Sequence, residues 1–389
     1  MGEPSARKGR KLTKILFFPT GDYGWYAGVA FFSGLAYSVN VNYGEEVKIY
    51  LGFFGENQEK VYRRAADTIV NISSRTLYDR AISKVCGYDY RVKRIINREK
   101  INAVFSMIPT QKYGKTPLIS WITDFQHKYL PEMFSEEECS WRDKRFLKTA
   151  EVSDRVLVKT ESIARDFRKF LPQFGKKVRI LKFTPIIPEN IYDIDPVEVA
   201  RKYNLPEKFV YFPGNFWKHK NHERFFKAVK MLKDEGKEIK IVCSGYNKDY
   251  RNPEYYDELF SKAVEWGIEE NIKHVGVIPH EDVLTLMRES ICVLNPSLFE
   301  GYGMTPREAD ALGKWVLLSD IPAHREHSFM DAQFFNPTDE EDIKMKLLKV
   351  WDSGVPGINA QKERTAREAQ KEKIKECADS FMEAVREVI

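Results

Sequence analysis

A loop with two glycines follows an apolar run near residue 295 and is the part of the sequence best suited to chemistry. The run 291–295 predicts a buried strand, and a helix is expected to start near Thr305. Gly301 and Gly303 let the backbone come close to a ligand, because glycine has no Cβ. The N–H groups at the helix start offer an anion site. We therefore expect a diphosphate to bind here without a metal, along Gly301, Tyr302, Gly303, Met304 and Thr305.

Two glutamates flank the same loop. Glu300 lies within it, where its carboxylate can reach sugar hydroxyls, and a carboxylate placed beside glycines needs a partner. Glu308 falls in the first helical turn, where it can hold a ribose diol. Residues 305–308 also match a capping box with Pro306 at the first helical position. Taken alone, Glu308 therefore fits a structural role equally well.

A second polar segment follows the apolar run 209–212 and leads into a helix predicted from His222. Lys220 stands at the entrance of that helix, beside a glycine-containing turn, where an ammonium group can clamp a phosphate. A surface lysine is the ordinary interpretation of any single residue of this kind. Taken alone, Lys220 therefore fits a surface role better than a phosphate site.

A histidine marks a third candidate segment in the first half of the chain. His127 follows Asp124 at the end of the predicted strand 117–122, a position that favours a ligand site. An isolated histidine is more often structural. A glycine turn with Gly21 and Asp22 follows the first predicted strand, and Gly245 ends a strand of the second half.

The elements that must position these residues alternate between apolar strands and amphipathic helices. This alternation is typical of parallel α/β layers, and 389 residues are enough for two such domains. In the first half we predict strands at residues 14–18, 47–53, 101–107, 117–122 and 155–159. In the second half we predict strands at residues 209–212, 239–244, 272–277, 291–295 and 315–319.

Prolines near residue 185 indicate the domain boundary, because proline cannot continue a helix or donate to a sheet. Strand ends of two such sheets are expected to meet at a cleft between the domains. The predicted parts are a basic leader at 1–13, a first Rossmann-like domain at 14–184, a linker at 185–200, a second domain at 201–362 and a C-terminal helix at 363–389.

The spacing of Glu300 and Glu308, with seven residues between them at a strand–loop–helix junction, resembles the hallmark of a known family. It is that of the retaining GT-B glycosyltransferases of family 4, also called glycosyl transferases group 1. The resemblance spans most of the chain and is strongest over residues 209–326. It implies two Rossmann-like domains facing across a cleft. It also implies that Glu300 contacts the donor sugar and Glu308 the nucleotide ribose.

The same resemblance assigns roles to the other candidates. An Arg and a Lys usually bracket the diphosphate in this family, but the chain has Asn215 where the Arg is expected and keeps Lys220. Lys218 or a residue of the first domain would then supply the second charge. His127, with Asp124 beside it, would bind the donor sugar and phosphate. Gly21 and Asp22 would cover the diphosphate, Gly245 would line the nucleotide site, and the backbone near Ile278 would contact the base.

We therefore expect a hexosyltransferase that transfers a sugar with retention and needs no cofactor and no metal. Its co-substrate would be a nucleotide diphosphate sugar, linked to GDP or UDP, and its acceptor a glycan or a lipid-linked glycan of cell-surface polysaccharide synthesis. Two alternatives are a non-catalytic nucleotide-sugar-binding subunit and a nucleotide-sugar epimerase. A transfer assay separates the first alternative, and an assay with donor alone separates the second.

Composition fits this expectation. The net charge of +5 is too small and too dispersed to indicate nucleic-acid binding. Five widely spaced cysteines without a CxxC pair favour a reducing cytoplasm over a disulfide framework. No apolar run reaches the length of a membrane span. The basic residues from Arg7 to Lys14 could attract anionic lipids, so peripheral membrane association is a further expectation, although a solvated leader is the simpler interpretation.

Overall fold

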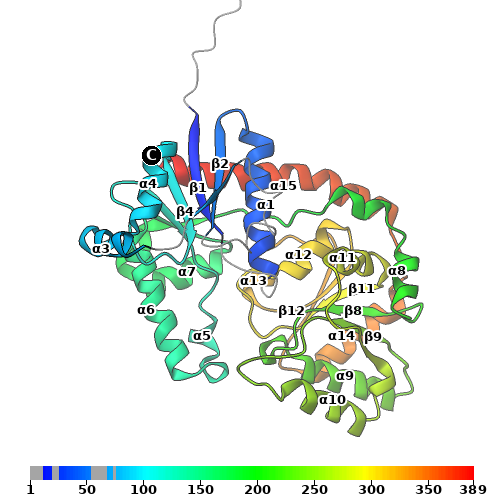
Figure 1. Ribbon diagram of the computed structural model, residues 1–389. Helices are drawn as coiled ribbons and strands as arrows, with labels where there is room; N and C mark the ends of the chain where they lie inside the picture. Colours follow the sequence, from blue (N-terminus) through cyan, green and yellow to red (C-terminus); the bar gives the residue numbers. More distant parts are fainter. Residues whose placement is uncertain (1–11, 20–25, 54–67, 73–75) are drawn as a thin grey trace, which may run out of the picture. The chain divides into compact units, whose positions relative to one another are not determined.

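The computed structural model describes residues 12–19, 26–53, 68–72 and 76–389. The chain divides into two compact units (Figure 1). The first unit contains residues 1–124, 140–184 and 372–389, so far as these are described, and the second contains residues 125–139 and 185–371.

The first unit is built on a parallel sheet of seven strands in the order β3-β2-β1-β4-β5-β6-β7. The strands are β1 (Thr13–Phe18), β2 (Val47–Phe53), β3 (Thr68–Asn71), β4 (Ala103–Met107), β5 (Leu118–Trp121), β6 (Arg155–Val158) and β7 (Val178–Ile180).

Alternate residues of β1 face opposite sides of this sheet. Phe17 packs edge-on against Phe32 of α1, Phe105 of β4 and Phe381 of α15, while Leu16 belongs to a core shared with α4. Helices therefore cover both faces of the sheet. The helices are α1 (Tyr26–Tyr43), α3 (Leu77–Cys86), α4 (Tyr90–Glu99), α6 (Glu136–Val152), α7 (Glu161–Phe170) and α15 (Ala360–Arg386), with the 3₁₀ helix η3 (Pro172–Lys177). The first turn of α6 and the first part of α15, up to residue 371, group with the second unit.

The second unit has a parallel sheet of six strands in the order β10-β9-β8-β11-β12-β13. This is the strand order of a Rossmann fold when the strands are renumbered from β8. The strands are β8 (Val210–Pro213), β9 (Ile241–Ser244), β10 (Ile272–His274), β11 (Cys292–Asn295), β12 (Val316–Ser319) and β13 (Ala332–Phe335).

Two cores sandwich this second sheet. Val210 and Phe212 of β8 belong to the core that includes Phe225 of α9, and Tyr211 belongs to the core that includes Leu284 of α11. The helices are α5 (Gln126–Tyr129), α8 (Pro196–Lys202), α9 (His222–Asp234), α10 (Tyr255–Glu265), α11 (His280–Glu289), α12 (Met304–Ala311), α13 (Pro322–Arg325) and α14 (Glu340–Ser353). Short 3₁₀ helices are η2 (Pro131–Met133), η4 (Glu189–Asp193), η5 (Lys218–Lys220) and η6 (Glu269–Asn271).

These two parallel sheets confirm the predicted α/β class, and each strand predicted from an apolar run is present. Among the described residues, three strands were not predicted: β3, β7 and β13 are only three or four residues long, and each is the outermost strand at an edge of its sheet. Cys243 and Cys292 lie buried in strands as free thiols. Within the described residues, no helix is both long and apolar enough to cross a membrane.

The units differ from the expected domain boundaries in three places. Residues 125–139 group with the second unit because Tyr129 stacks on Phe299 at 5.6 Å and Tyr250 Oη donates to Glu138 at 2.8 Å. The end of α15 groups with the first unit. Part of the expected linker is also core, since Ile187 and the α8 residue Val199 are buried in the second unit.

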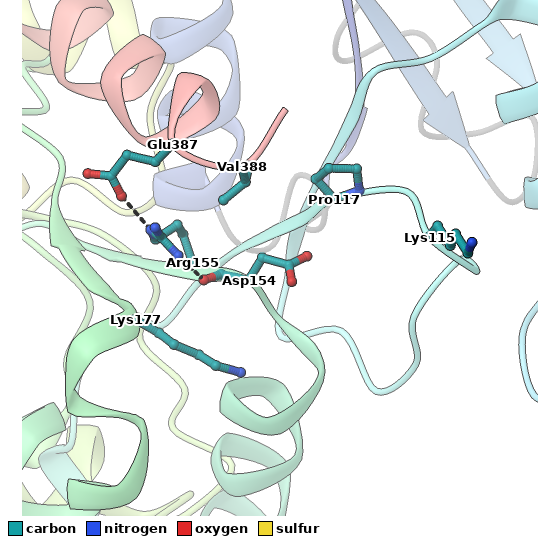
Figure 2. A pocket seen from close by; sticks show the side chains of 7 residues that line it. All are labelled: Lys115, Pro117, Asp154, Arg155, Lys177, Glu387 and Val388. Atoms are coloured by element: carbon teal, nitrogen blue, oxygen red, sulfur yellow. Dashed lines mark hydrogen bonds and ion pairs between the residues drawn. The ribbon is translucent and has the colours of Figure 1, made fainter.

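A hollow of about 420 Å³ lies in the first unit, at the amino-terminal ends of β5 and β6 (Figure 2). Two of its three lining cations are already engaged: Arg155 pairs with Glu387, and Lys177 Nζ donates to three backbone carbonyls at 2.7–3.1 Å. Ligands of parallel sheets bind at the opposite, carboxyl edge. This hollow therefore carries none of the predicted chemistry. It is lined by Lys115, Pro117, Asp154, Arg155, Lys177, Glu387 and Val388.

Candidate functional site

The two loops with the predicted charged residues lie at one edge of the second sheet. β8 and β11 are neighbours in the sheet, although β9 and β10 separate them in sequence. In open parallel sheets, ligands bind at such a switch point, beyond the carboxyl ends of the strands. Residues 214–221 follow β8 and residues 296–303 follow β11, so both loops belong to this switch point.

Lys220 and Glu300 meet there as an ion pair. Lys220 Nζ lies 2.6 Å from Glu300 Oε1. The same oxygen accepts a hydrogen bond from Ser297 Oγ at 2.7 Å and a longer one from Asn295 Nδ2 at 3.4 Å. Within the described part of the chain, no donor bonds to the second oxygen, Oε2. One carboxylate oxygen is thus fixed by the protein, and the other can accept from a ligand hydroxyl.

The pair keeps Glu300 ionised in a largely buried position. Burial alone would raise the pKa of Glu300, because an ionised carboxylate loses hydration. The charge and hydrogen bond of Lys220 outweigh burial and hold this pKa at about 2. Burial, reinforced by the Lys220 charge, also lowers the pKa of His219 to about 3. At neutral pH the site therefore contains a carboxylate, an ammonium group and a neutral imidazole.

The glycine loop ends directly at the start of α12. The helix begins at Met304, with Gly303 in the left-handed conformation (φ 73°) before it, and no side chain caps its first N–H groups. The alternative capping box at residues 305–308 is therefore not formed. Uncapped N–H groups at a helix start are the donors that an anion site needs. Arg307 also binds the loop, because its Nε donates to Tyr302 O at 3.0 Å.

Gly303→Ala is expected to lower the melting temperature more than Gly267→Ala. Both glycines have a left-handed φ, of 73° and 64°, which costs an L-residue about 1–2 kcal/mol. A Cβ at Gly303 would in addition lie 3.3 Å from His324 and Pro306, whereas nothing lies within 4 Å at Gly267. Thermal unfolding of the two variants measures the difference. Equal losses would show that the loop tolerates a side chain beside His324.

Glu308 is buried, and its Oε1 lies 3.0 Å from His280 Nε2. Two other histidines near the loop, which as single residues could be taken for surface or capping residues, prove to be packed and hydrogen-bonded. His324 is fully buried and donates from Nδ1 to Ser319 O at 2.8 Å, and His327 bonds to Asp310 at 2.9 Å. Tertiary packing determines these positions, because single histidines carry no burial signal in the sequence.

Asn215 occupies the place of an expected cation and has a structural contact. Its Oδ1 accepts from Tyr246 N at 3.0 Å, which ties the loop after β8 to the loop after β9. Gly245 lies so close to Gly214 that a Cβ would stand 2.2 Å from Gly214 O. Gly245 N also donates to Gly276 O at 2.9 Å. The loops after three neighbouring strands are therefore joined, next to the partly buried Ile278.

A cation other than Lys218 lies near Lys220 in this unit. Lys218 is exposed, whereas Arg251 stands over the Trp217 ring at 5.3 Å from its centre. Two hydrogen bonds of 2.8 Å join Arg251 to the buried Asp249. The charge of Arg251 also helps to lower the pKa of His219, after burial and Lys220.

His127 lies in the short helix α5 and is 2% exposed, with the rings of Phe125 and Phe134 on either side. The segment that contains it packs on the second unit, where Tyr129 stacks on Phe299, the residue before Glu300. Asp124 groups with the first unit, where its Oδ1 lies 3.9 Å from Arg142 Nη1. Gly21 and Asp22 lie outside the described residues.

The sequence analysis did not identify Asn295 and Ser297, at the end of β11, as site residues. Asn295 and Ser297 both bond to Glu300, and Asn221 joins the two loops through its side-chain amide. Asn295 and Asn221 did carry a signal, since polar residues directly after a strand or before a helix often serve a site at that edge.

Comparison with known proteins agrees with this geometry. Residues 198–372 match the family Glycosyl transferases group 1. The O-antigen chain mannosyltransferase RfbU of Salmonella typhimurium is 28% identical over 178 residues, which are 43% of this chain and 46% of that protein. The chain thus aligns with less than half the length of this curated relative.

Solved structures extend the likeness of the fold to nearly the whole chain. A glycosyltransferase from Rickettsia africae superposes with a TM-score of 0.69 and 12% identity, covering 98% of this chain and 99% of that one. Anabaena Alr3699/HepE, in complex with UDP and glucose, superposes with a TM-score of 0.60 and 13% identity, covering 96% and 95%.

Two parallel α/β units, the second with its charged loops at a Rossmann switch point, define the GT-B class of fold. With the family match, residues 198–372 are a domain of the group 1 glycosyltransferase type. The predicted family is thereby confirmed at the level of group 1.

Proposed function

We propose that this chain transfers a hexose from a nucleotide diphosphate sugar to a glycan or lipid-linked acceptor, with retention of configuration and without a metal. The Lys220–Glu300 pair carries this proposal, because it sets a cation and a half-free carboxylate beside a glycine loop and an uncapped helix start. The cation and the backbone N–H groups suit a diphosphate, and the carboxylate suits sugar hydroxyls.

In this proposal the second unit is the donor domain and the first unit supplies the acceptor side. Lys220 and the N–H groups from Gly301 to Met304 stabilise the leaving diphosphate, so its charge develops against preorganised donors. Glu300 Oε2 accepts from a sugar hydroxyl and Glu308 from the ribose. Asn215, Gly245, Ile278, Tyr302 and Thr305 line the nucleotide site, His127 and Asp124 serve the sugar and phosphate, and Gly21 and Asp22 cover the diphosphate.

The comparisons support the substrate class. RfbU is by its name an O-antigen chain mannosyltransferase, and the Anabaena structure contains UDP and glucose. We therefore propose a GDP- or UDP-linked donor, an acceptor of cell-surface polysaccharide synthesis, and action in the cytoplasm at the membrane face where lipid-linked acceptors are assembled. Asn215 keeps a non-catalytic nucleotide-sugar-binding subunit as a second candidate, since it leaves the site with fewer cations than the family norm.

Thermal unfolding with GDP, UDP and ADP, each in EDTA, tests the donor site. A ligand at about 100 times its Kd adds about 2.7 kcal/mol, so the matching nucleotide is expected to raise the melting temperature by about 5–10 °C. The Lys220→Met variant is the control and should lose the shift. If no nucleoside diphosphate shifts the wild type, the donor site is refuted. Binding without transfer to any glycan acceptor would favour the non-catalytic subunit.

A further inference from the structure

Asn221 combines an unusual backbone conformation with a buried polar side chain. Its backbone adopts the left-handed conformation (φ 62°, ψ 33°), and its side chain is buried, with 4% exposed. Asparagine tolerates this conformation better than most residues with a Cβ. The side-chain amide Nδ2 donates to two backbone carbonyls, Pro296 O at 3.1 Å and Pro337 O at 2.8 Å.

The bond to Pro296 has a counterpart on the other side of Lys220. His219 O accepts from Leu298 N at 2.8 Å. The two residues that flank Lys220 are therefore each bonded to a residue that flanks Ser297. Ser297 itself donates to the Glu300 oxygen that faces Lys220. Two hydrogen bonds thus join the loop after β8 to the loop after β11, next to the Lys220–Glu300 ion pair.

We propose that Asn221 is a positioning residue whose side-chain amide holds the loop of Lys220 against the loop of Glu300. Lys220 and Glu300 are 80 residues apart in sequence, and each stands on a loop without regular secondary structure beyond one 3₁₀ turn. Without a tie, each long side chain would lose rotamer freedom to form the pair. With the hydrogen bonds of Asn221, Lys220 and Glu300 are already positioned for each other before any ligand binds.

Three substitutions separate the amide from the backbone. Asn221→Gly keeps the left-handed conformation and removes the amide, and Asn221→Ala removes the amide and strains the backbone. Asn221→Asp keeps the size and the tolerance of this conformation but turns the donor into an acceptor facing two carbonyl oxygens. If only the backbone matters, alanine is the worst variant. If the amide matters, aspartate is as damaging as glycine or worse.

The first readout needs no ligand. It is an NMR titration of the Glu300 carboxyl in the folded protein, for which we expect a wild-type pKa of about 2, because Lys220 outweighs burial. We expect this pKa to rise in Asn221→Gly and Asn221→Asp as Lys220 loosens. Asn204→Gly is the matched control, because Asn204 also has a left-handed φ (51°) but is exposed and far along the chain from both loops. The control should leave the pKa of Glu300 unchanged.

The second readout is the affinity for GDP or UDP by calorimetry, well below the melting temperature of each variant. This readout rests on the proposed function. Loss of two hydrogen bonds that set the clamp is expected to weaken binding about 10-fold, and more for aspartate than for glycine. A purely structural role would lower the melting temperature and leave the affinity of the folded protein as it is.

The two failures are distinguishable. If the wild type binds no nucleoside diphosphate, the proposed function is lost, and the Glu300 titration still decides the role of Asn221. If the wild type binds but Asn221→Gly and Asn221→Asp match it in both affinity and Glu300 pKa, the positioning role is wrong.

Discussion

Replacing Glu300 by glutamine is expected to lower kcat/KM for sugar transfer about 10- to 100-fold with little change in fold. The substitution keeps the shape of the side chain and removes its charge. A hydrogen bond to a charged group contributes about 1.5–3 kcal/mol, and 1.4 kcal/mol corresponds to tenfold. Glu300 Oε2 is the oxygen placed for the sugar, while Oε1 is held by Lys220 and Ser297.

The measurement is steady-state transfer with the nucleotide sugar identified by thermal unfolding. Asp320→Asn is the matched control, because Asp320 lies at the end of β12 in the same unit but forms an exposed pair with Arg325. Such exposed pairs contribute little, so the control should retain wild-type activity. Near wild-type kinetics for Glu300→Gln would remove Glu300 from the donor site.

The fold was predictable from the sequence because strands buried on both faces are continuous apolar runs. β2 was predicted at its observed bounds, and β11 was predicted one residue too long at its start. The strand β13 was missed for a physical reason: Ala332, Gln333 and Phe334 are only partly buried, so the outermost strand of the sheet lacks the full apolar signal.

The charged residues of the site were predictable, and the groups that hold them were not. Lys220 and Glu300 each follow a predicted strand, so they could be assigned to one edge of a sheet. That the two side chains meet depends on β8 and β11 being neighbours, which follows from topology and not from local pattern. The amide of Asn221 acts across 75 and 116 residues, a distance at which the sequence shows no periodicity.

At Asn215 the sequence already showed a departure from the family pattern, which usually has an arginine there, and the structure gives a reason for the asparagine. A side-chain amide accepts a backbone N–H from Tyr246 and closes the loops after β8 and β9. An arginine has no acceptor and could not form this bond. The loss of one cation is therefore linked to a loop contact, and Arg251 stands on the loop that this contact secures.

Replacing Lys220 by methionine is expected to abolish most transfer and to destabilise the protein in a pH-dependent way. Methionine fills the space of the stem without the charge, so Glu300 is left buried and unpaired. Removing one partner of a buried ion pair costs about 3–5 kcal/mol at neutral pH. Nucleotide affinity should fall as well, because the diphosphate loses its cation.

The sign of the pH dependence follows from the pKa of Glu300. In the wild type this pKa is about 2, below the ordinary 4.5, so the pair stabilises the fold above pH 4.5 and loses this contribution as the pH falls toward 2. Without Lys220, burial raises the pKa of Glu300 above 4.5. The stability of the variant therefore declines as the pH rises from 4.5 toward this raised pKa. Urea unfolding should therefore show a larger loss of unfolding free energy for Lys220→Met at pH 7 than at pH 4.5.

Adding Glu300→Gln to Lys220→Met removes the unpaired charge and should recover stability without recovering transfer. An equal deficit at both pH values would mean that the ion pair does not control the ionisation of Glu300.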